Sequence, residues 1–102
     1  MRRYIAVAAA LGLACAWVKL TPGGEAVRVA DESQVRGCET KGRTHAQTTD
    51  RVAIFARGEQ RIQQELESLA RNEAALMGGD AIVPASGIER GRQTFDVYNC
   101  AK

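Results

Sequence analysis

Residues 57–77 carry the pattern that most constrains how this 102-residue chain can fold. At about 100° per residue, their apolar side chains fall on a single stripe of a helix. The stripe consists of Ile62, Leu66, Leu69, Ala70, Leu76 and Met77. Gly78 and Gly79 follow directly, and glycine supplies the left-handed backbone with which many helices end. The sequence therefore predicts one amphipathic helix, which needs a second apolar surface to cover its stripe.

Segments with the pattern of short strands flank this helix and can supply that surface. In residues 93–100, for example, Phe95 and Val97 lie on one face of an extended chain. The predicted strands are 26–30, irregular extended stretches within 35–49, 81–84 and 93–100. The order strand, strand, helix, strand, strand predicts an α+β fold. In that fold the helix packs on one face of a small, mostly antiparallel sheet.

The first residues of the chain have the pattern of a bacterial export signal. Two arginines precede an apolar run, Tyr4–Ala14, which is too short to span a bilayer core that needs about 20 helical residues. A run of this length behind positive charge is typical of signal peptides. It ends in a small residue followed by Cys15, as in a bacterial lipobox. These features predict a signal peptide at 1–14, a lipid-modified Cys15 and one small domain at 15–102.

The same segment has a second interpretation. Ala14 and Ala16 flank Cys15 in the small-x-small pattern of ordinary signal peptidase cleavage, and the lipobox positions before Cys15 hold Gly12 and Leu13. Cleavage after Ala16 would release a soluble periplasmic ligand-binding protein or small enzyme. If Cys15 carries the lipid, the residue that follows it is Ala16 and not the aspartate that retains lipoproteins in the inner membrane. The lipid-anchored alternative therefore favours the outer membrane, with the domain facing the periplasm.

The three cysteines support the lipid-anchored alternative, because an oxidising compartment leaves one of an odd number without a partner. If Cys15 carries lipid, Cys38 and Cys100 remain to form a disulfide. That bridge would close a loop of about 63 residues and stabilise the domain by ~4 kcal/mol in the chain-entropy model.

The charge balance argues against a nucleic-acid partner. The net charge of +2 comes from two arginines in the predicted signal peptide, and the rest of the chain has as many basic as acidic residues. A neutral domain lacks the clustered lysines and arginines that neutralise phosphates.

The run that begins at Leu69, LARNEAALMGGDAIVP, resembles a small bacterial envelope lipoprotein family of unknown function. The segments CAWVKLTP from Cys15 and FDVYNC from Phe95 resemble the same family. That family is distantly similar in fold to the outer-membrane lipoprotein that senses envelope damage for the Rcs phosphorelay. The resemblance implies a lipid at Cys15, a bridge between Cys38 and Cys100, and an α+β domain displayed in the periplasm.

Two polar residues of the predicted helix are candidates for a buried polar or ligand-binding site. Glu73 lies about 20° from Ile62 on the helical wheel, and a buried carboxylate must find a partner or take up a proton. We predict that Glu73 pairs with Arg28 or Arg92, or accepts backbone N–H groups; the alternative is a pH-sensitive or ligand-binding acid. Asn72 lies at the flank of the stripe, where its amide is expected to bond a neighbouring strand or loop.

The chain lacks a recognisable catalytic, metal-binding or cofactor-binding motif. His45 is the only histidine, and no serine lies in the nucleophile elbow of a hydrolase. Cys38, His45 and Cys100 are too scattered for a zinc site, and a disulfide would remove two of them.

The basic turn that contains Arg90 and Arg92 has the chemistry to contact cell-wall carboxylates or lipid phosphates. We therefore expect a non-enzymatic protein without a cofactor, with a role in binding, sensing or envelope maintenance. Its expected partners are the membrane, through Cys15, and an envelope protein or peptidoglycan.

Overall fold

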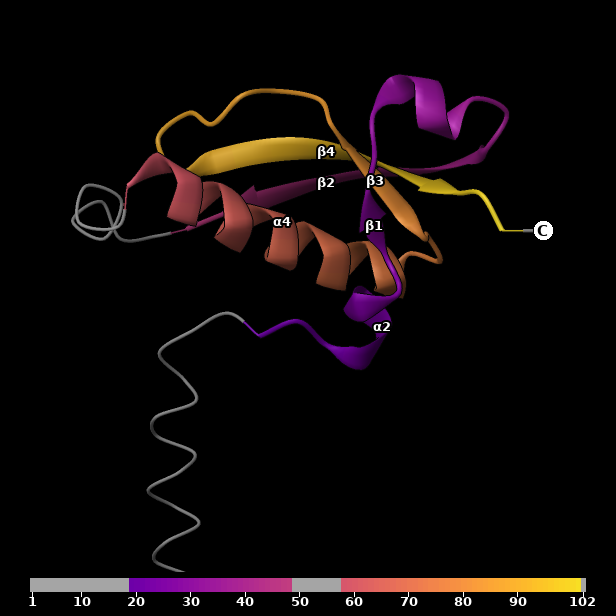
Figure 1. Ribbon diagram of the computed structural model, residues 1–102, viewed down its shortest axis with the longest axis horizontal. Helices are drawn as coiled ribbons and strands as arrows, with labels where there is room; N and C mark the ends of the chain where they lie inside the picture. The colour runs from indigo at the N-terminus through magenta and orange to yellow at the C-terminus, as the bar shows by residue number, and fades with distance from the viewer. Residues whose placement is uncertain (1–18, 49–57, 102) are drawn as a thin grey trace, which may run out of the picture.

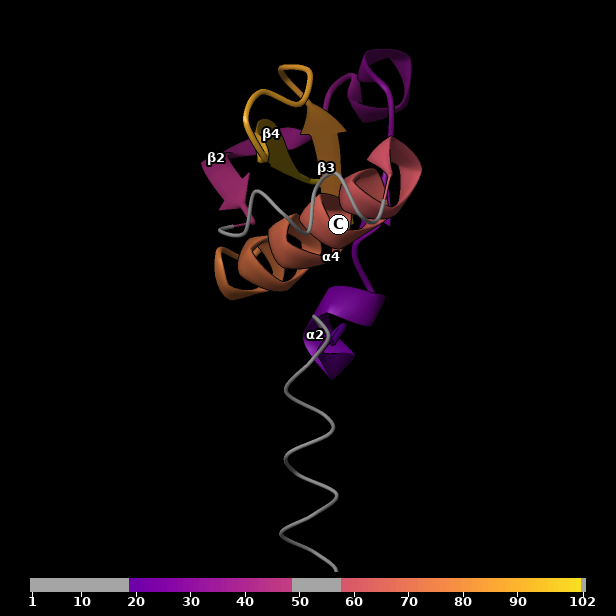
Figure 2. The same cartoon turned by 90° about the vertical axis from the view of Figure 1, so that its left-hand side faces the viewer.

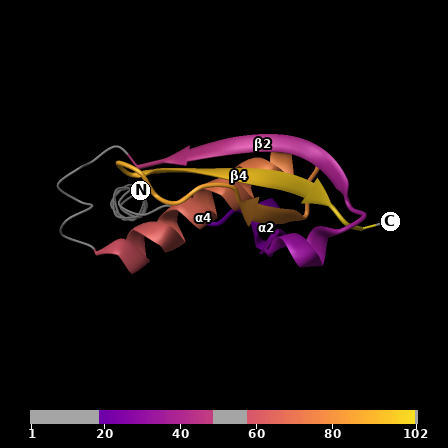
Figure 3. The same ribbon diagram turned by 90° about the horizontal axis from the view of Figure 1, so that it is seen from above.

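The computed structural model describes residues 19–48 and 58–101. Along the chain, the elements are α2 (Pro22–Glu25), β1 (Arg28–Val29), the 3₁₀ helix η1 (Glu32–Val35), β2 (Glu39–Gln47), α4 (Glu59–Leu76), β3 (Ala81–Pro84) and β4 (Arg92–Asn99). The helix α4 lies across one face of a four-stranded sheet (Figures 1 and 3). The predicted α+β class and the succession of two strands, one main helix and two strands are therefore confirmed.

The sheet is mixed, with the strand order β1-β3-β4-β2. β4 pairs antiparallel with both β3 and β2, which agrees with the antiparallel part of the prediction. β1 instead runs parallel to β3, with Arg28 opposite Ala81 and Val29 opposite Ile82. The prediction of a mostly antiparallel sheet was therefore only partly right. A two-residue strand carries no pattern that reveals the direction of its partner.

Two segments that flank β1 form short helical elements. The Thr21 hydroxyl caps α2 by accepting the N–H of Gly24 at 3.0 Å, and Pro22 occupies the first turn, where its missing N–H costs nothing. Asp31 and Gln34 form a reciprocal capping box around η1. The irregular stretches predicted within 35–49 are one strand, β2, with a bulge between Thr40 and Gly42.

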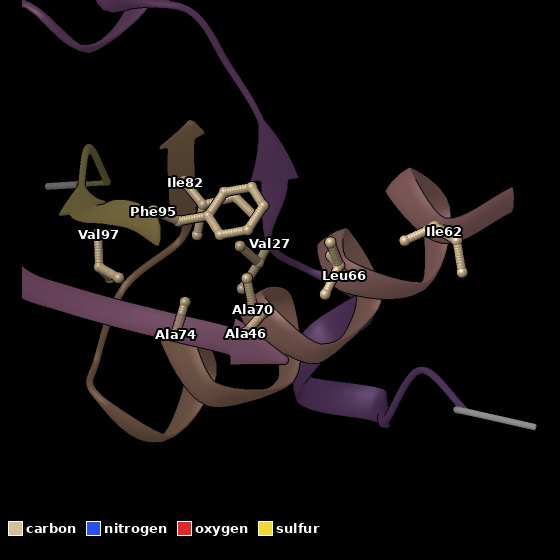
Figure 4. Packing of buried hydrophobic residues seen from close by; sticks show 9 residues of the cluster. All are labelled: Val27, Ala46, Ile62, Leu66, Ala70, Ala74, Ile82, Phe95 and Val97. Atoms are coloured by element: carbon tan, nitrogen blue, oxygen red, sulfur yellow. The ribbon is translucent and has the colours of Figure 1, made fainter. Parts of the chain in front are cut away.

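The main core lies between α4 and the sheet (Figure 4). Phe95 of β4 and Leu66 of α4 are both fully buried in it. The buried members of this cluster are Val27, Ala46, Ile62, Leu66, Ala70, Ala74, Ile82, Phe95 and Val97. Burial of such side chains contributes about 1.5–3 kcal/mol for each large aliphatic or aromatic residue, so this layer is the main stabilising feature of the fold.

The buried line of α4 rotates around the helix as it crosses the sheet. Its members recur every four residues, from Ile62 to Ala74, and each step therefore advances by about 40°. Leu69 and Met77 are half-buried beside this line, whereas Leu76 is 83% exposed. The predicted stripe is confirmed at its start and wrong at Leu76, because it assumed that one fixed side of the helix faces the sheet.

A second, smaller cluster covers the opposite face of the sheet. It consists of Ala30, Val35, Ala81 and Val83, with Cys38, Tyr98 and Cys100 packed against it. Since side chains alternate along a strand, Ile82 of β3 points to the main core while its two neighbours point to this cluster. β3 is therefore apolar and buried on both faces, like the central strand of a larger sheet.

Candidate functional site

The predicted lipidation site, Cys15, and the predicted signal peptide, 1–14, lie outside the described residues. Both stay predictions. Three arrangements in the described part of the chain have chemistry to explain: the segment that follows Cys15, the disulfide, and a polar groove beside the β3–β4 connection.

The segment that follows Cys15 is fixed to α4 by the side chain of Asn72. The Asn72 Oδ1 atom accepts hydrogen bonds from the Thr21 N–H at 2.9 Å and from the Thr21 hydroxyl at 3.1 Å. Its Nδ2 atom donates to the carbonyl oxygen of Lys19 at 2.8 Å. This confirms the expectation that the Asn72 amide bonds a neighbouring segment. The arrangement shows no sign of a ligand site.

Arg71 and Gly24 complete this contact, which we call the N-terminal clamp (residues 19–27 with Arg71 and Asn72). Arg71 donates from Nε to the carbonyl oxygen of Val27 at 2.6 Å. Gly24 is buried, and a Cβ atom at this position would collide with the side-chain oxygen of Asn72. The absence of a side chain at Gly24 is therefore what allows α2 to approach α4 this closely (Figure 2).

Cys38 and Cys100 form a disulfide that closes 62 residues of sequence, with their Cα atoms 4.6 Å apart. The predicted pairing is therefore present. Cys38 precedes β2 and Cys100 follows β4, and the paired strands place Glu39 opposite Asn99. The disulfide thus links the two segments one residue beyond the last pair of the β2–β4 ladder.

Glu73 is exposed, so the prediction of a buried carboxylate was wrong. The reason is the rotation of the buried line of α4, which has moved to Ala74 by this point. Glu73 lies instead beside an open depression between α4 and β2 that Arg43 also lines. Within the described residues, no ion pair joins it to an arginine.

The structure does not bring the four predicted site residues together. Arg28 is exposed on β1, at one edge of the sheet. Arg92 is exposed at the start of β4, where it pairs with Gln47 of β2 at the other edge. Asn72 belongs to the N-terminal clamp, and Glu73 faces solvent. The combined buried site predicted from these residues is therefore not formed.

Arg92 lies instead in a polar groove of about 490 Å³, which we call the hairpin groove. It is formed by the end of β2, the start of β4 and the connection between β3 and β4. Its lining residues are His45, Gln47, Ser86, Glu89, Arg90, Arg92, Gln93 and Thr94. In sequence these residues form three separate groups, so the sequence alone predicted a binding role only for the arginines of the basic turn.

A tight two-residue turn fixes the backbone beside this groove. The backbone N–H and C=O groups of Glu89 and Arg92 exchange hydrogen bonds at 2.8 and 2.9 Å. Between them, Arg90 and Gly91 have φ values of 52° and 76°, the left-handed pair typical of a type I′ hairpin turn. Asparagine, aspartate and glycine favour the position that Arg90 holds, and other residues are uncommon there.

Polar residues that line the groove are hydrogen-bonded to one another or to neighbouring segments. Gln93 is only 5% exposed; its Oε1 accepts from Gln63 of α4 at 2.8 Å, and its Nε2 donates to the carbonyl oxygen of Ser86 at 2.9 Å. His45 Nδ1 lies 3.0 Å from the Thr94 hydroxyl. Gln93 thus ties α4, β4 and the connection into one unit, a role its sequence position did not reveal.

Two groups elsewhere on the surface have shifted pKa values. The hydrogen bond from the Ser33 hydroxyl, at 2.6 Å, lowers the pKa of Asp31, and the Gln34 N–H acts in the same direction. The carboxylate of Asp96 lies 2.8 Å from Arg43 Nε and raises the pKa of Arg43. This pair joins opposite positions of β2 and β4.

Two further kinds of site are absent from the part of the chain that the structure describes. Within 19–48 and 58–101, no group of three or more His, Cys, Asp and Glu residues is arranged to hold a metal ion. In the same part of the chain, none of the helices combines the length and apolar character needed to cross a bilayer.

The chain is thus a small α+β domain with a mixed four-stranded sheet, one main helix and a disulfide between the ends of two paired strands. It belongs to the DUF4156 family, a domain of unknown function, which matches residues 18–100. No curated protein and no solved structure matches it. The family match agrees with the predicted resemblance to a family of unknown function; the predicted similarity to the Rcs sensor stays a prediction.

Proposed function

We propose that this protein is a lipid-anchored, non-enzymatic component of the bacterial cell envelope. In this proposal Cys15 carries the lipid, the membrane is the outer membrane, and the domain faces the periplasm. It binds a partner there and contributes to sensing or to envelope maintenance.

The observation that carries the proposal is the pairing of Cys38 with Cys100. The chain has three cysteines, so the bridge leaves Cys15 as the one without a partner in the chain. Cys15 lies between the apolar run and the folded domain, where a lipobox cysteine is expected. An exported protein with one spare thiol at this place is best explained by modification of that thiol.

The N-terminal clamp gives the proposed anchor a short reach. Lys19 is bonded to Asn72 and lies four residues after Cys15, a distance that an extended chain spans in at most ~14 Å. A lipid on Cys15 would therefore hold α2 and the clamped side of α4 against the membrane surface. Leu76, which is 83% exposed, lies one helical turn beyond Asn72 on that side.

The same geometry would direct the hairpin groove away from the membrane. Figures 1 and 2 place the connection between β3 and β4 on the opposite side of the molecule from α2. A domain anchored through Cys15 would thus present this groove to the periplasm and the cell wall.

The intact mass of the mature protein, measured with and without reductant, tests the proposal. An acylated chain that begins at Cys15 and gains two hydrogens on reduction is the expected result. Release of the Cys15→Ser variant from the membrane fraction would agree with it. A plain chain that begins at Trp17 would overturn the proposal in favour of the soluble periplasmic ligand-binding protein or enzyme.

The predicted similarity to the Rcs sensor would give the sensing role a specific form. Deletion of the gene should then alter an envelope-stress reporter, and the Cys15→Ser variant should fail to restore it. An unchanged reporter would leave binding or maintenance as the role of the anchored domain.

A further inference from the structure

We propose that the hairpin groove binds a carboxylate-bearing peptide ligand through Arg90 and Arg92. The oxyanion chemistry follows from the groove itself. Its assignment to a cell-wall peptide rests on the proposed envelope location.

The groove carries an excess of positive charge that the domain does not use internally. Arg90 and Arg92 line it together with a single acidic residue, Glu89. Elsewhere in the described residues, ion pairs join Lys41 to Glu39 and Arg43 to Asp96. Neither groove arginine takes part in an ion pair within that part of the chain. Both guanidinium groups are therefore available to an oxyanion, which arginine binds in a bidentate geometry.

The backbone that carries these arginines is held before any ligand arrives. The paired hydrogen bonds between Glu89 and Arg92 fix the turn, and the Thr48 N–H donates to the carbonyl oxygen of Gly91 at 2.8 Å. Arg90 also occupies a left-handed conformation that glycine would adopt at lower cost. Strained backbone of this kind is often found at ligand-binding positions.

The size and lining of the groove fit a short peptide or a sugar–peptide fragment. A volume of about 490 Å³ falls within the range of about 300–1,000 Å³ typical of small-ligand sites. Ser86, His45 and Thr94 add hydroxyl and imidazole groups that can bond amides and carboxylates.

The position of the groove separates two sources of an oxyanion in an envelope, lipid phosphates and cell-wall peptides. Lipid phosphates would lie on the side of α2, whereas the connection between β3 and β4, which lines the groove, lies on the opposite side (Figures 1 and 2). Peptides of the cell wall carry free carboxylates and lie on the periplasmic side. We therefore assign the groove to a peptide carboxylate and not to a phosphate.

Titration calorimetry on the purified oxidised protein in detergent tests this inference. The probes are a soluble disaccharide–tetrapeptide fragment of peptidoglycan and, separately, inorganic phosphate. We expect saturable binding of the peptide fragment, with phosphate bound at least about tenfold more weakly.

Two variants and one control connect that binding to the groove. Arg92→Gln should weaken binding by about tenfold or more. Arg90→Gly removes the second guanidinium and relieves the left-handed strain, so it should lose affinity while keeping or raising the unfolding temperature. Arg28→Gln removes an exposed arginine at the far edge of the sheet and should bind like the unaltered protein.

Absence of saturable binding would overturn the inference, as would equal losses in all three variants or tighter binding of phosphate. These results do not depend on the lipid. A groove that binds peptide on a protein without acylation would overturn the proposed anchor alone.

Discussion

The side-chain oxygen of Asn72 accepts both the backbone N–H and the hydroxyl of Thr21, which lies 51 residues earlier in the chain. One amide thus satisfies two donors of the segment between the predicted lipid site and the domain. The Thr21 hydroxyl is at the same time the cap of α2. The start of the domain is therefore defined by hydrogen bonds to a helix and not by apolar burial alone.

Replacement of Asn72 by alanine should release this segment. Asn72→Ala removes three hydrogen bonds to Lys19 and Thr21, and we expect a loss of about 1–3 kcal/mol in the free energy of unfolding. Limited proteolysis should also cut near residues 19–24 sooner. Gln64→Ala, at an exposed position of the same helix, is the control and should change stability by less than about 0.5 kcal/mol. Equal effects of the two variants would contradict the role given to Asn72.

Gly79 should not tolerate a side chain. A Cβ atom there would collide with Val97 and lie 3.1 Å from the carbonyl oxygen of Tyr98, because the connection between α4 and β3 lies against β4 at this point. We expect Gly79→Ala to cost about 1–3 kcal/mol, as overpacking of a core does. Gly87→Ala is the matched control, because nothing lies within 4 Å of its Cβ position. Chemical denaturation of both variants measures the difference; similar midpoints would contradict this packing.

Loss of the disulfide should lower stability strongly without removing the fold's main core. The bridge closes 62 residues of sequence, and the chain-entropy model gives it about 4 kcal/mol. The double variant with Cys38→Ser and Cys100→Ser should unfold at a correspondingly lower denaturant concentration. Reduction of the unaltered protein should lower the midpoint of denaturation to the same extent. Addition of reductant to the double variant is the control and should have no further effect. An unchanged midpoint would show that the bridge does not constrain the unfolded chain.

The ionised side chain of Asp31 should stabilise the folded protein only above the acidic pH range. Its pKa in the folded protein is lowered, chiefly by the Ser33 hydroxyl, so the stabilisation is present above the unfolded pKa of about 4. It is lost as the pH falls through the lower, folded value. Asp31→Asn keeps a capping side chain but cannot ionise. Thermal unfolding from pH 6 to pH 2 should show the unaltered protein losing its advantage over the variant as the pH falls below about 4. A constant difference would contradict this assignment.

Asn72 and Glu73 show which features of α4 can be predicted from the sequence and which cannot. Helical periodicity correctly predicted α4 and the burial of Ile62 and Leu66, because these depend on a local pattern. It misplaced Glu73, since the side of α4 that meets the sheet depends on how the helix crosses the strands. Asn72 was predicted to bond a neighbour, but its partners, Lys19 and Thr21, are set by the path of the chain.

The sheet and the hairpin groove were also predictable from the sequence only where a local pattern determines them. The alternation of Phe95 and Val97 predicted β4 and its inward face. The parallel pairing of β1 was beyond prediction because Arg28–Val29 is too short to carry a signal. The hairpin groove combines residues of β2, β4 and the connection between β3 and β4. Only the strand order of the sheet brings these segments together.

The parallel pairing of β1 with β3 makes the two ends of the domain interdependent. β3 takes one neighbour from the beginning of the domain and the other, β4, from its end. Deletion of either terminal portion would therefore remove one ladder from β3 and leave backbone N–H and C=O groups on that side of the strand unpaired. Neither half of this domain is expected to fold as a separate fragment, and a split version should assemble only when both pieces are supplied together.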